Sequence, residues 1–258
     1  MNKRTSERLK GIGKSGLQIL TALLVLLAFW GAAYLFVGNE LLVPGFTDCM
    51  KKLGKLLASV SFWKNTWQSL LRVLLAFSVS FIIAAIFALI AYMLPWFYRF
   101  LSPIVSVLRS LPALAVLLIL LVWWGAAYAP VAVAFLSLFP MLYTGILAAL
   151  FSVDKEYIEM SRVYKVPKRK QIMYLYLPAA APYVIRESGG ALAFSLKLVV
   201  SAEVLANTRA SLGGMMQEAR LYLDIPLLFA LVGVTFLLGL IIELFATFFA
   251  ETVERRVR

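Results

Sequence analysis

The sequence predicts an all-α membrane protein with six transmembrane helices, forming one domain over residues 1–258. Apolar residues make up 62% of the chain and charged residues only 15%, against about 25% charged residues in a soluble domain. The apolar residues are gathered in long runs without a charge, of the length that a helix needs to cross a bilayer. A membrane β-barrel would instead show short segments of alternating polarity.

Residues 1–16 form a polar, basic N-terminal segment, and the first charge-free run follows it at Leu17–Val37. This run has 21 residues, which is longer than the apolar region of about 7–15 residues in a cleavable signal peptide. No small-x-small cleavage site with a polar start after it is evident. We therefore interpret the run as a retained first span.

Residues 38–67 form a loop that is long enough to fold. Thr47 or Asp48 could cap a helix there, and its apolar residues recur at helical spacing at Met50, Leu53, Leu57 and Val60. The pattern predicts a short amphipathic helix on the outer face of the membrane. A spacer packed on the spans and a role in solute handling are both compatible with it.

Spans two to four follow from two further runs. Val73–Leu94 has 22 residues without a charge, and Ser110–Val153 has 44. As a single helix the longer run would extend about 66 Å, roughly twice the thickness of a bilayer core. We expect it to turn at Gly125–Pro130, because Gly and Pro interrupt helices. The third span would then begin near Leu101.

The fifth and sixth spans are predicted at Tyr183–Ala206 and Ile225–Ala250, and both contain charges. A lone charge at the centre of a membrane costs at least about 3 kcal/mol. Lys197 and Glu203 lie six residues apart, on helix faces about 120° from each other, so they are poorly placed to pair. Lys197 could line a path and attract an anionic group, or it could snorkel or pair with a carboxylate of another span.

The distribution of Lys and Arg predicts the orientation. With a cytoplasmic N-terminus, the inside segments hold 17 of these residues and the outside segments hold 6. This asymmetry favours both termini in the cytoplasm, as an even number of spans requires. It also accounts for the net charge of +12 without a nucleic-acid partner.

Residues 152–182 form the longest predicted cytoplasmic loop. Ser152 and Asp154 offer helix caps, and acidic residues follow in the first turns, where the helix dipole favours them. Pro167 would end the first helix, and Pro178 would end a second one at about Lys168–Tyr176. Two short amphipathic helices could form a docking surface or a solvated connector.

The composition excludes several kinds of chemistry. The chain contains no His and a single Cys, Cys49, which rules out Ser-His-Asp catalysis, an internal disulfide and a Cys-rich metal site. It also lacks the full phosphate-binding pattern Gly-x-x-x-x-Gly-Lys-Ser/Thr, because Arg8 stands where the segment Gly13-Lys14-Ser15 would need the first Gly. We therefore expect no catalytic residue, metal or cofactor in this chain, and any ATP hydrolysis would belong to a partner.

The loop also carries a recognisable motif. It reads Glu159-Met160-Ser161-Arg162-Val163-Tyr164-Lys165 and ends at Leu177-Pro178. This resembles the loop motif of ABC importer permeases, Glu-Ala-Ala with Gly four residues after the second Ala, and a hydrophobic-Leu-Pro ending. Met160 and Ser161 stand where the family has the alanines, and Lys165 stands where it usually has Gly.

Three more segments occur in the order and spacing of the same family. They are Ser69-Leu70-Leu71-Arg72, Leu108-Arg109-Ser110-Leu111-Pro112 and Ala202-Glu203-Val204. Together with the loop they are similar to the nitrate, sulfonate and taurine branch of these permeases, and the resemblance extends over Val43–Glu254.

The resemblance implies a channel-forming subunit in a bacterial cytoplasmic membrane. Its expected partners are a second permease copy, cytoplasmic subunits that bind ATP and Mg, an extracytoplasmic solute-binding protein and membrane lipid. The solute would be small, with an anion among the options. The residues expected to dock the ATPase are Glu159, Met160, Ser161, Arg162, Lys165, Val166, Pro167, Leu177 and Pro178.

Lys197, Glu203 and Arg109 are the candidates for the translocation path, although Arg109 and Arg72 would also suit anchors at the membrane interfaces. The alternative function is an ion-gradient-driven secondary transporter or channel. It would predict inverted repeats and several carboxylates within the membrane, and the sequence shows no clear repeat.

Overall fold

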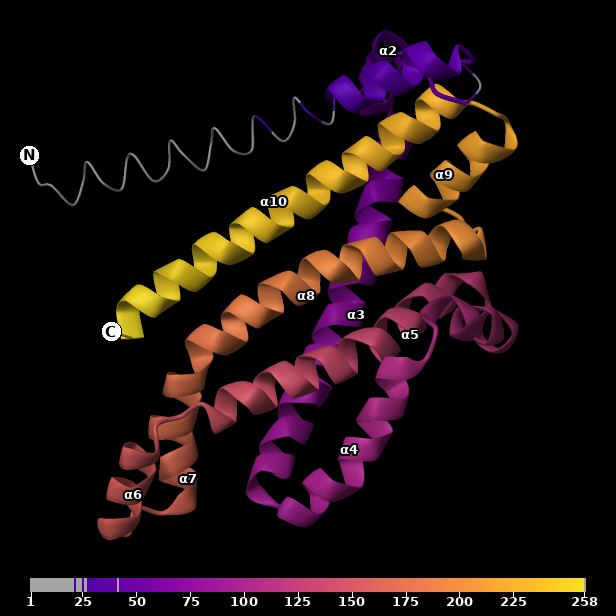
Figure 1. Ribbon diagram of the computed structural model, residues 1–258. Coiled ribbons are helices and arrows are strands. Elements are labelled where there is room, and N and C mark those ends of the chain that lie inside the picture. The colour runs from indigo at the N-terminus through magenta and orange to yellow at the C-terminus, as the bar shows by residue number, and fades with distance from the viewer. Residues whose placement is uncertain (1–20, 22–24, 26, 41, 258) are drawn as a thin grey trace, which may run out of the picture. The chain divides into compact units, whose positions relative to one another are not determined.

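The computed structural model describes residues 21, 25, 27–40 and 42–257, and every regular element among them is a helix (Figure 1). Four of these helices are long and apolar enough to cross a membrane: Val60–Met93, Ala113–Phe151, Lys168–Ala206 and Ile225–Phe248. The predicted class, an all-α membrane protein, is therefore confirmed. Of the two remaining predicted crossings, the first lies partly outside the described residues, and the third is divided between two helices.

The chain divides into two compact units, one of residues 1–58 with 219–230 and the other of residues 59–218 with 231–258. In the first unit, Leu27–Val37 is an apolar helix. Residues 17–20, 22–24 and 26 of the predicted first span lie outside the described residues.

The helix expected in the outer loop is α2, Phe46–Leu57. The predicted caps are wrong, because Gly45 is the N-cap and Asp48 lies within the first turn. The extended backbone of Gly45 allows its carbonyl to accept the N–H groups of Asp48 and Cys49, so the helix starts before either predicted cap. Val60 belongs to the next helix and not to α2.

Aromatic packing and an ion pair between distant parts of the sequence hold the first unit together. The Trp30 indole N–H donates to the Pro44 carbonyl over 3.1 Å, and its ring lies against Phe46 and Phe229. Lys52 pairs with Asp224 in the turn before α10, Ile225–Val257.

The second unit begins with α3, Val60–Met93, which starts well before the predicted Val73. Its 34 residues correspond to about 51 Å, so it is longer than a bilayer core. The side that it buries consists of small residues four positions apart: Ala76, Ser80, Ala84 and Ala88. Small residues allow helix backbones to approach closely within a membrane.

The third predicted crossing, from near Leu101, is not one helix. α4, Pro95–Ser110, ends at Leu111, and α5, Ala113–Phe151, begins after Pro112. Pro lacks an N–H and disfavours a helical conformation in the residue before it, so Leu111 is extended.

The turn expected at Gly125–Pro130 is confined to Gly125, whose φ of 70° and ψ of 175° break α5 into two parts. A residue with a side chain rarely adopts that φ. Pro130 lies inside the second part.

The loop after α5 contains α6, Lys155–Val163, and α7, Lys168–Gln171. The prediction that Pro178 ends the second helix is wrong. A π-helical turn at Ile172–Tyr176 joins α7 to α8, Leu177–Ala206. The N–H of Leu177 bonds to the carbonyl of Ile172, and Pro178 sits in the first turn of α8, where a missing N–H is tolerated.

The core of the second unit lies where α3, α5 and α8 pack on one another. Leu117, Leu120, Ala129, Val133 and Ala202 form one buried apolar cluster there. The cluster joins both parts of α5 to the C-terminal part of α8. It therefore holds in place the polar site described next.

Candidate functional site

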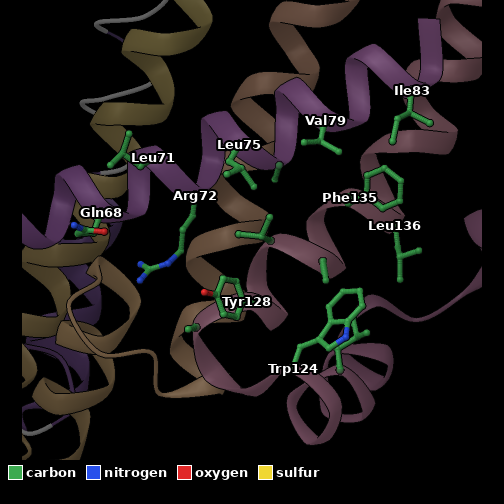
Figure 2. Close-up of a pocket in the computed structure, with 15 residues that line it drawn as sticks. Gln68, Leu71, Arg72, Leu75, Val79, Ile83, Trp124, Tyr128, Phe135 and Leu136 are labelled. Atoms are coloured by element: carbon green, nitrogen blue, oxygen red, sulfur yellow. The ribbon is translucent and has the colours of Figure 1, made fainter. Parts of the chain in front are cut away.

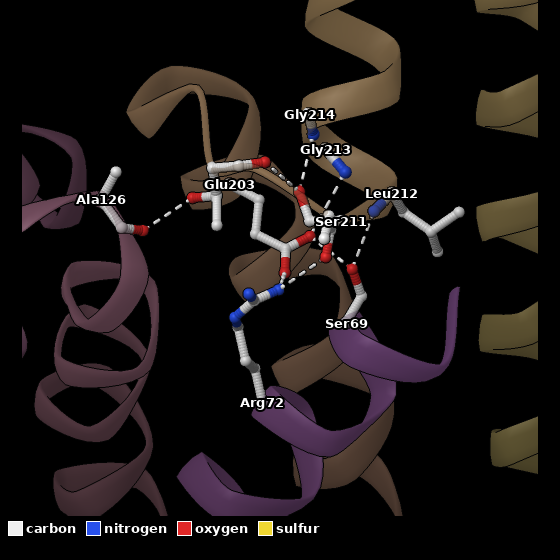
Figure 3. Close-up of polar contacts among 10 residues, drawn as sticks. Ser69, Arg72, Ala126, Glu203, Ser211, Leu212, Gly213 and Gly214 are labelled. Atoms are coloured by element: carbon white, nitrogen blue, oxygen red, sulfur yellow. Dashed lines mark hydrogen bonds and ion pairs between the residues drawn. The ribbon is translucent and has the colours of Figure 1, made fainter. Parts of the chain in front are cut away.

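A buried carboxylate, Glu203, lies at the centre of a polar cluster between α3, α8 and α9, Leu212–Leu221 (Figure 3). Its side chain is 0% exposed. Oε1 accepts an N–H of Arg72 at 2.9 Å, and Oε2 accepts the Ser69 hydroxyl at 2.7 Å and the Gly213 N–H at 3.2 Å. Three donors from different parts of the chain therefore compensate one buried charge.

The start of α9 is fully hydrogen-bonded by this cluster. The N–H of Leu212 bonds to Ser69 Oγ, that of Gly213 to Glu203, and that of Gly214 to Ser211 Oγ. Free N–H groups and the positive end of the helix dipole favour a carboxylate at this position. Glu203 is thus both the partner of Arg72 and a ligand of the α9 N-terminus.

The chain reaches this geometry through a tight turn after α8. Asn207 has a φ of 50°, and the N–H of Thr208 bonds to the carbonyl of Glu203, the pattern of a Schellman motif. The Thr208 hydroxyl then donates to the carbonyl of Ala126, next to the break in α5. The turn therefore connects α8 to α5 as well as to α9.

Gly213 is required by close packing. A Cβ at this position would lie 2.4 Å from Glu203 Cβ and 2.5 Å from the backbone nitrogen of Val204. Neither neighbour is the end of a flexible side chain, so even Ala would force the backbone apart.

A groove of about 900 Å³ lies beside the cluster, between α3 and α5 (Figure 2). Its polar lining residues, Gln68, Arg72 and Tyr128, contrast with the apolar remainder, which includes Leu75 and Phe135. In Figure 2, Gln68 and Arg72 lie toward one end and Ile83 toward the other. Arg72 thus belongs to both the buried cluster and the groove.

The three residues predicted to line the path, Lys197, Glu203 and Arg109, do not share a site: each has different surroundings. Glu203 is buried in the cluster, and Arg109 is an exposed residue in the last turn of α4. Lys197 is exposed and lines a hollow of about 340 Å³ between α8 and α10, which Glu243 also lines. Among the described residues, neither Lys197 nor Glu243 has an ion-pair partner within 4 Å.

The predicted docking loop is largely exposed. Glu159, Met160, Lys165 and Pro167 face outward, as do Leu177 and Pro178 at the start of α8, whereas Ser161 is buried and Val166 half-buried. The side chain of Arg162 lies outside the described residues.

Lys165 has a φ of 51°, and the N–H of Val166 bonds to the carbonyl of Ser161. This is again a Schellman motif, in which Gly is the usual residue at the left-handed position.

Ser69, Arg72 and Glu203 belong to separate motifs of the sequence, and the fold brings them together. The roles of Thr208, Ser211 and Gly213 are not predicted by those motifs. The sequence does contain a pattern that predicts a closely packed helix start. A Ser precedes two Gly shortly after the fifth span, in Ser211-Leu212-Gly213-Gly214. Among the described residues, no group of three or more His, Cys, Asp or Glu side chains could hold a metal.

Comparison with known proteins agrees with this architecture. The family model for the binding-protein-dependent transport system inner membrane component matches residues 80–258. The taurine transport system permease protein TauC of Escherichia coli (strain K12) is 24% identical over 234 residues, covering 88% of this chain and 85% of that protein. The riboflavin transport system permease protein RibX of Chloroflexus aurantiacus is 26% identical over 94% of this chain and 92% of its own length.

Solved structures show the same fold. A chain of the MetNI methionine ABC transporter in an inward-facing conformation superposes with a TM-score of 0.67 at 16% identity, covering 75% of this chain and 96% of its own. A chain of an amino acid ABC transporter gives 0.67 at 18% identity, covering 78% and 97%. The predicted importer-permease fold is confirmed by these superpositions.

Proposed function

Because the chain belongs to the family of binding-protein-dependent transport system inner membrane components, we propose that it moves a small solute inward with ATP hydrolysed by a separate subunit. The chain is the permease subunit of an ABC importer in a bacterial inner membrane.

The observation that carries the proposal is the loop of α6 and α7. It carries Glu159, Met160 and Lys165 between the end of α5 and the start of α8, two long helices that pack on each other. A contact on α6 would therefore act directly on the core of the second unit. Such a rigid connection is what a motor subunit needs to switch the access of a path.

The orientation in this proposal places both termini and the α6–α7 loop in the cytoplasm, in line with the Lys and Arg asymmetry. ATP and Mg would be held by the cytoplasmic partner, and a solute-binding protein would deliver solute to the opposite face. A second copy of the permease would complete the path.

Lys197 and Arg109 are proposed to face the path, where their charges would favour an anionic solute. Glu203 is fully buried, so we propose that it acts on the path through Arg72. Replacing Lys197 by Met should lower the uptake of an anionic solute, whereas unchanged uptake would assign this lysine a structural role.

The docking proposal is tested by charge reversal at Glu159. The full chain, tagged and expressed in its own host, should retain an ATP-hydrolysing partner on purification, and Glu159→Arg should reduce the amount retained by at least tenfold. The matched control is Glu218→Arg, which reverses an exposed carboxylate on α9. Membrane insertion of each variant is measured in parallel.

Two outcomes would contradict the proposal. One is normal recovery of the ATPase and normal uptake in the Glu159→Arg variant. The other is uptake of solute by the purified chain alone in liposomes with an ion gradient, which would favour the secondary transporter.

A further inference from the structure

Two charged side chains, Lys197 and Glu243, line the same hollow between α8 and α10, and both lie within helices long enough to span a membrane. Among the described residues, neither has an ion-pair partner within 4 Å. A charge within a span is costly unless it is paired or hydrated. Ser201 and Thr235 bring hydroxyl groups to the hollow, and the rest of its lining is apolar: Val200, Val204, Met216, Val232, Phe236, Gly239 and Leu240.

Two close contacts define how α8 packs on α10. A Cβ on Gly189 would lie 2.4 Å from Ala246 Cβ, and a Cβ on Gly239 would lie 3.8 Å from Leu196 Cδ2. Leu196 follows Gly189 by seven residues, and Gly239 precedes Ala246 by seven. The two helices therefore run antiparallel and stay level with each other over about 10 Å.

This packing directs Lys197 and Glu243 toward each other. Lys197 lies eight residues beyond the contact of Gly189 with Ala246, and Glu243 lies three residues beyond it in the same direction. The two positions therefore differ by about 7.5 Å along the helices. A helical side chain leans toward the N-terminus of its own helix, so on antiparallel helices Lys197 leans toward the level of Glu243 and Glu243 toward that of Lys197. The flexible four-carbon stem of a lysine can close such a gap.

Other pairings suit these two charges less well. Arg186 lines a separate hollow of about 460 Å³ that Glu243 also reaches. It lies three residues before Gly189, about 9 Å from the level of Glu243, and the same rule makes the two side chains lean away from each other. An anionic head group beside Lys197 would share the hollow with the Glu243 carboxylate, which would repel it.

We propose that Glu243 is the counter-ion of Lys197 and positions its ammonium group within the hollow between α8 and α10. Glu243 is thus a positioning residue that acts through the lysine. The consequence for transport rests on the proposed function: an anion that reached Lys197 would have to compete with Glu243 for the ammonium group.

A direct test joins the two side chains chemically, in the full chain in phosphatidylcholine nanodiscs. Dicyclohexylcarbodiimide, an apolar reagent, activates a carboxyl group, and a neighbouring lysine amine displaces dicyclohexylurea to form an amide. We expect an amide between Lys197 and Glu243, identified by proteolysis and mass spectrometry, in a product that runs as a monomer on a denaturing gel. A water-soluble carbodiimide should join Lys52 to Asp224, which pair in the first unit, and this reaction controls for the folded state.

Arg186→Lys makes the alternative partner a competing amine. Positions 186 and 197 then both carry an amine on α8 near Glu243. The amide to Lys197 should form in a yield at least about tenfold higher than the amide to position 186, because reaction rates depend steeply on how the groups are placed.

Charge exchange provides an independent test by thermal unfolding. Lys197→Glu and Glu243→Lys each place two like charges in the hollow, and each should lower the Tm by about 4 °C or more. The double variant should recover most of this loss. The matched control combines Lys197→Glu with Glu218→Lys, at an exposed carboxylate of α9, and should recover none. Glu243→Asp keeps the charge and should have a Tm closer to that of the parent than Glu243→Gln.

Three results would overturn the inference. The first is no amide between Lys197 and Glu243 while Lys52 and Asp224 are joined. The second is an amide only in a dimer-sized product, which would place the pair between two copies. The third is recovery of the Glu243→Lys variant by Arg186→Glu and not by Lys197→Glu.

Recovery of the ATPase from the same preparations separates the two proposals. Loss of the ATPase from the parent chain contradicts the importer function, whatever the yield of the amide. A retained ATPase without the amide contradicts only the pairing of Lys197 with Glu243.

Discussion

Two helices of this chain end in the same kind of turn but in different surroundings. α8 ends with Asn207 at a φ of 50°, and α6 ends with Lys165 at a φ of 51°. In both turns the following N–H bonds to a carbonyl five residues back. The local backbone is therefore the same, and the difference between the two regions lies in what the turn contacts.

The turn after α8 is tied to three other helices. It places Glu203, Thr208 and Ser211 where their polar atoms bond to α3, α5 and α9, and all three side chains are buried. The turn after α6 leaves Tyr164, Lys165 and Pro167 exposed. The first turn thus stabilises the subunit itself, whereas the second leaves its side chains free for another molecule.

The strongest test of this contrast is Arg72→Met. Removing one partner of a buried pair leaves an uncompensated charge on Glu203 and should lower the free energy of unfolding by about 3–5 kcal/mol. Unfolding of the purified chain in detergent measures the loss. Adding Glu203→Gln to Arg72→Met should recover most of it, because the charge is then absent. A loss no larger than that of the exposed control Arg99→Met would show that the pair is not buried.

Gly213→Ala should have the next largest effect. Its Cβ would meet Glu203 Cβ at 2.4 Å and the carbonyl oxygen of Val200 at 2.7 Å, so we expect a destabilisation of about 1–3 kcal/mol. The control is Gly190→Ala on α8, where nothing lies within 4 Å of the added Cβ. That change should stabilise the helix by about 0.5–1 kcal/mol. Equal Tm shifts for the two variants would contradict the packing around α9.

Lys165→Gly should act in the opposite direction. A left-handed conformation costs a residue with a side chain about 1–2 kcal/mol, and Gly at position 165 removes this cost. The greater conformational freedom of Gly in the unfolded chain offsets part of the resulting stabilisation. We expect a net stabilisation of about 1 kcal/mol, seen as slower proteolysis of the loop. Lys168→Gly, within the helical segment α7, should instead speed cleavage. Faster cleavage of Lys165→Gly would exclude the left-handed turn.

The smallest effect is expected for Asn207→Gly. Asn tolerates the left-handed region because its short side chain bonds locally, so the change in unfolding free energy should stay within about 0.5 kcal/mol. Comparing the Tm shifts of Asn207→Gly and Lys165→Gly tests whether Asn fits the left-handed turn better than Lys does. A gain from Asn207→Gly equal to that from Lys165→Gly would mean that Asn offers no advantage at the first turn.

Much of the fold could be predicted from the sequence because the membrane limits the choice. Charge-free runs gave the position of the long helices, and the excess length of Ser110–Val153 required a break that the structure places at Gly125. The start of α3 and the continuation of α7 into α8 were missed. Both depend on how a helix extends beyond the membrane or passes a proline, and hydropathy does not report either.

The long apolar runs are enough to predict a helical chain that lies in a membrane, because backbone groups in lipid must bond within their own helix. The sequence by itself also located the exposed loop, whose motif is contiguous. Only the tertiary structure joined Arg72 to Glu203 and placed the α9 N-terminus on the same carboxylate. A buried charge needs partners from separate helices, and which faces of those helices meet is decided by packing and not by the spacing of residues along the chain.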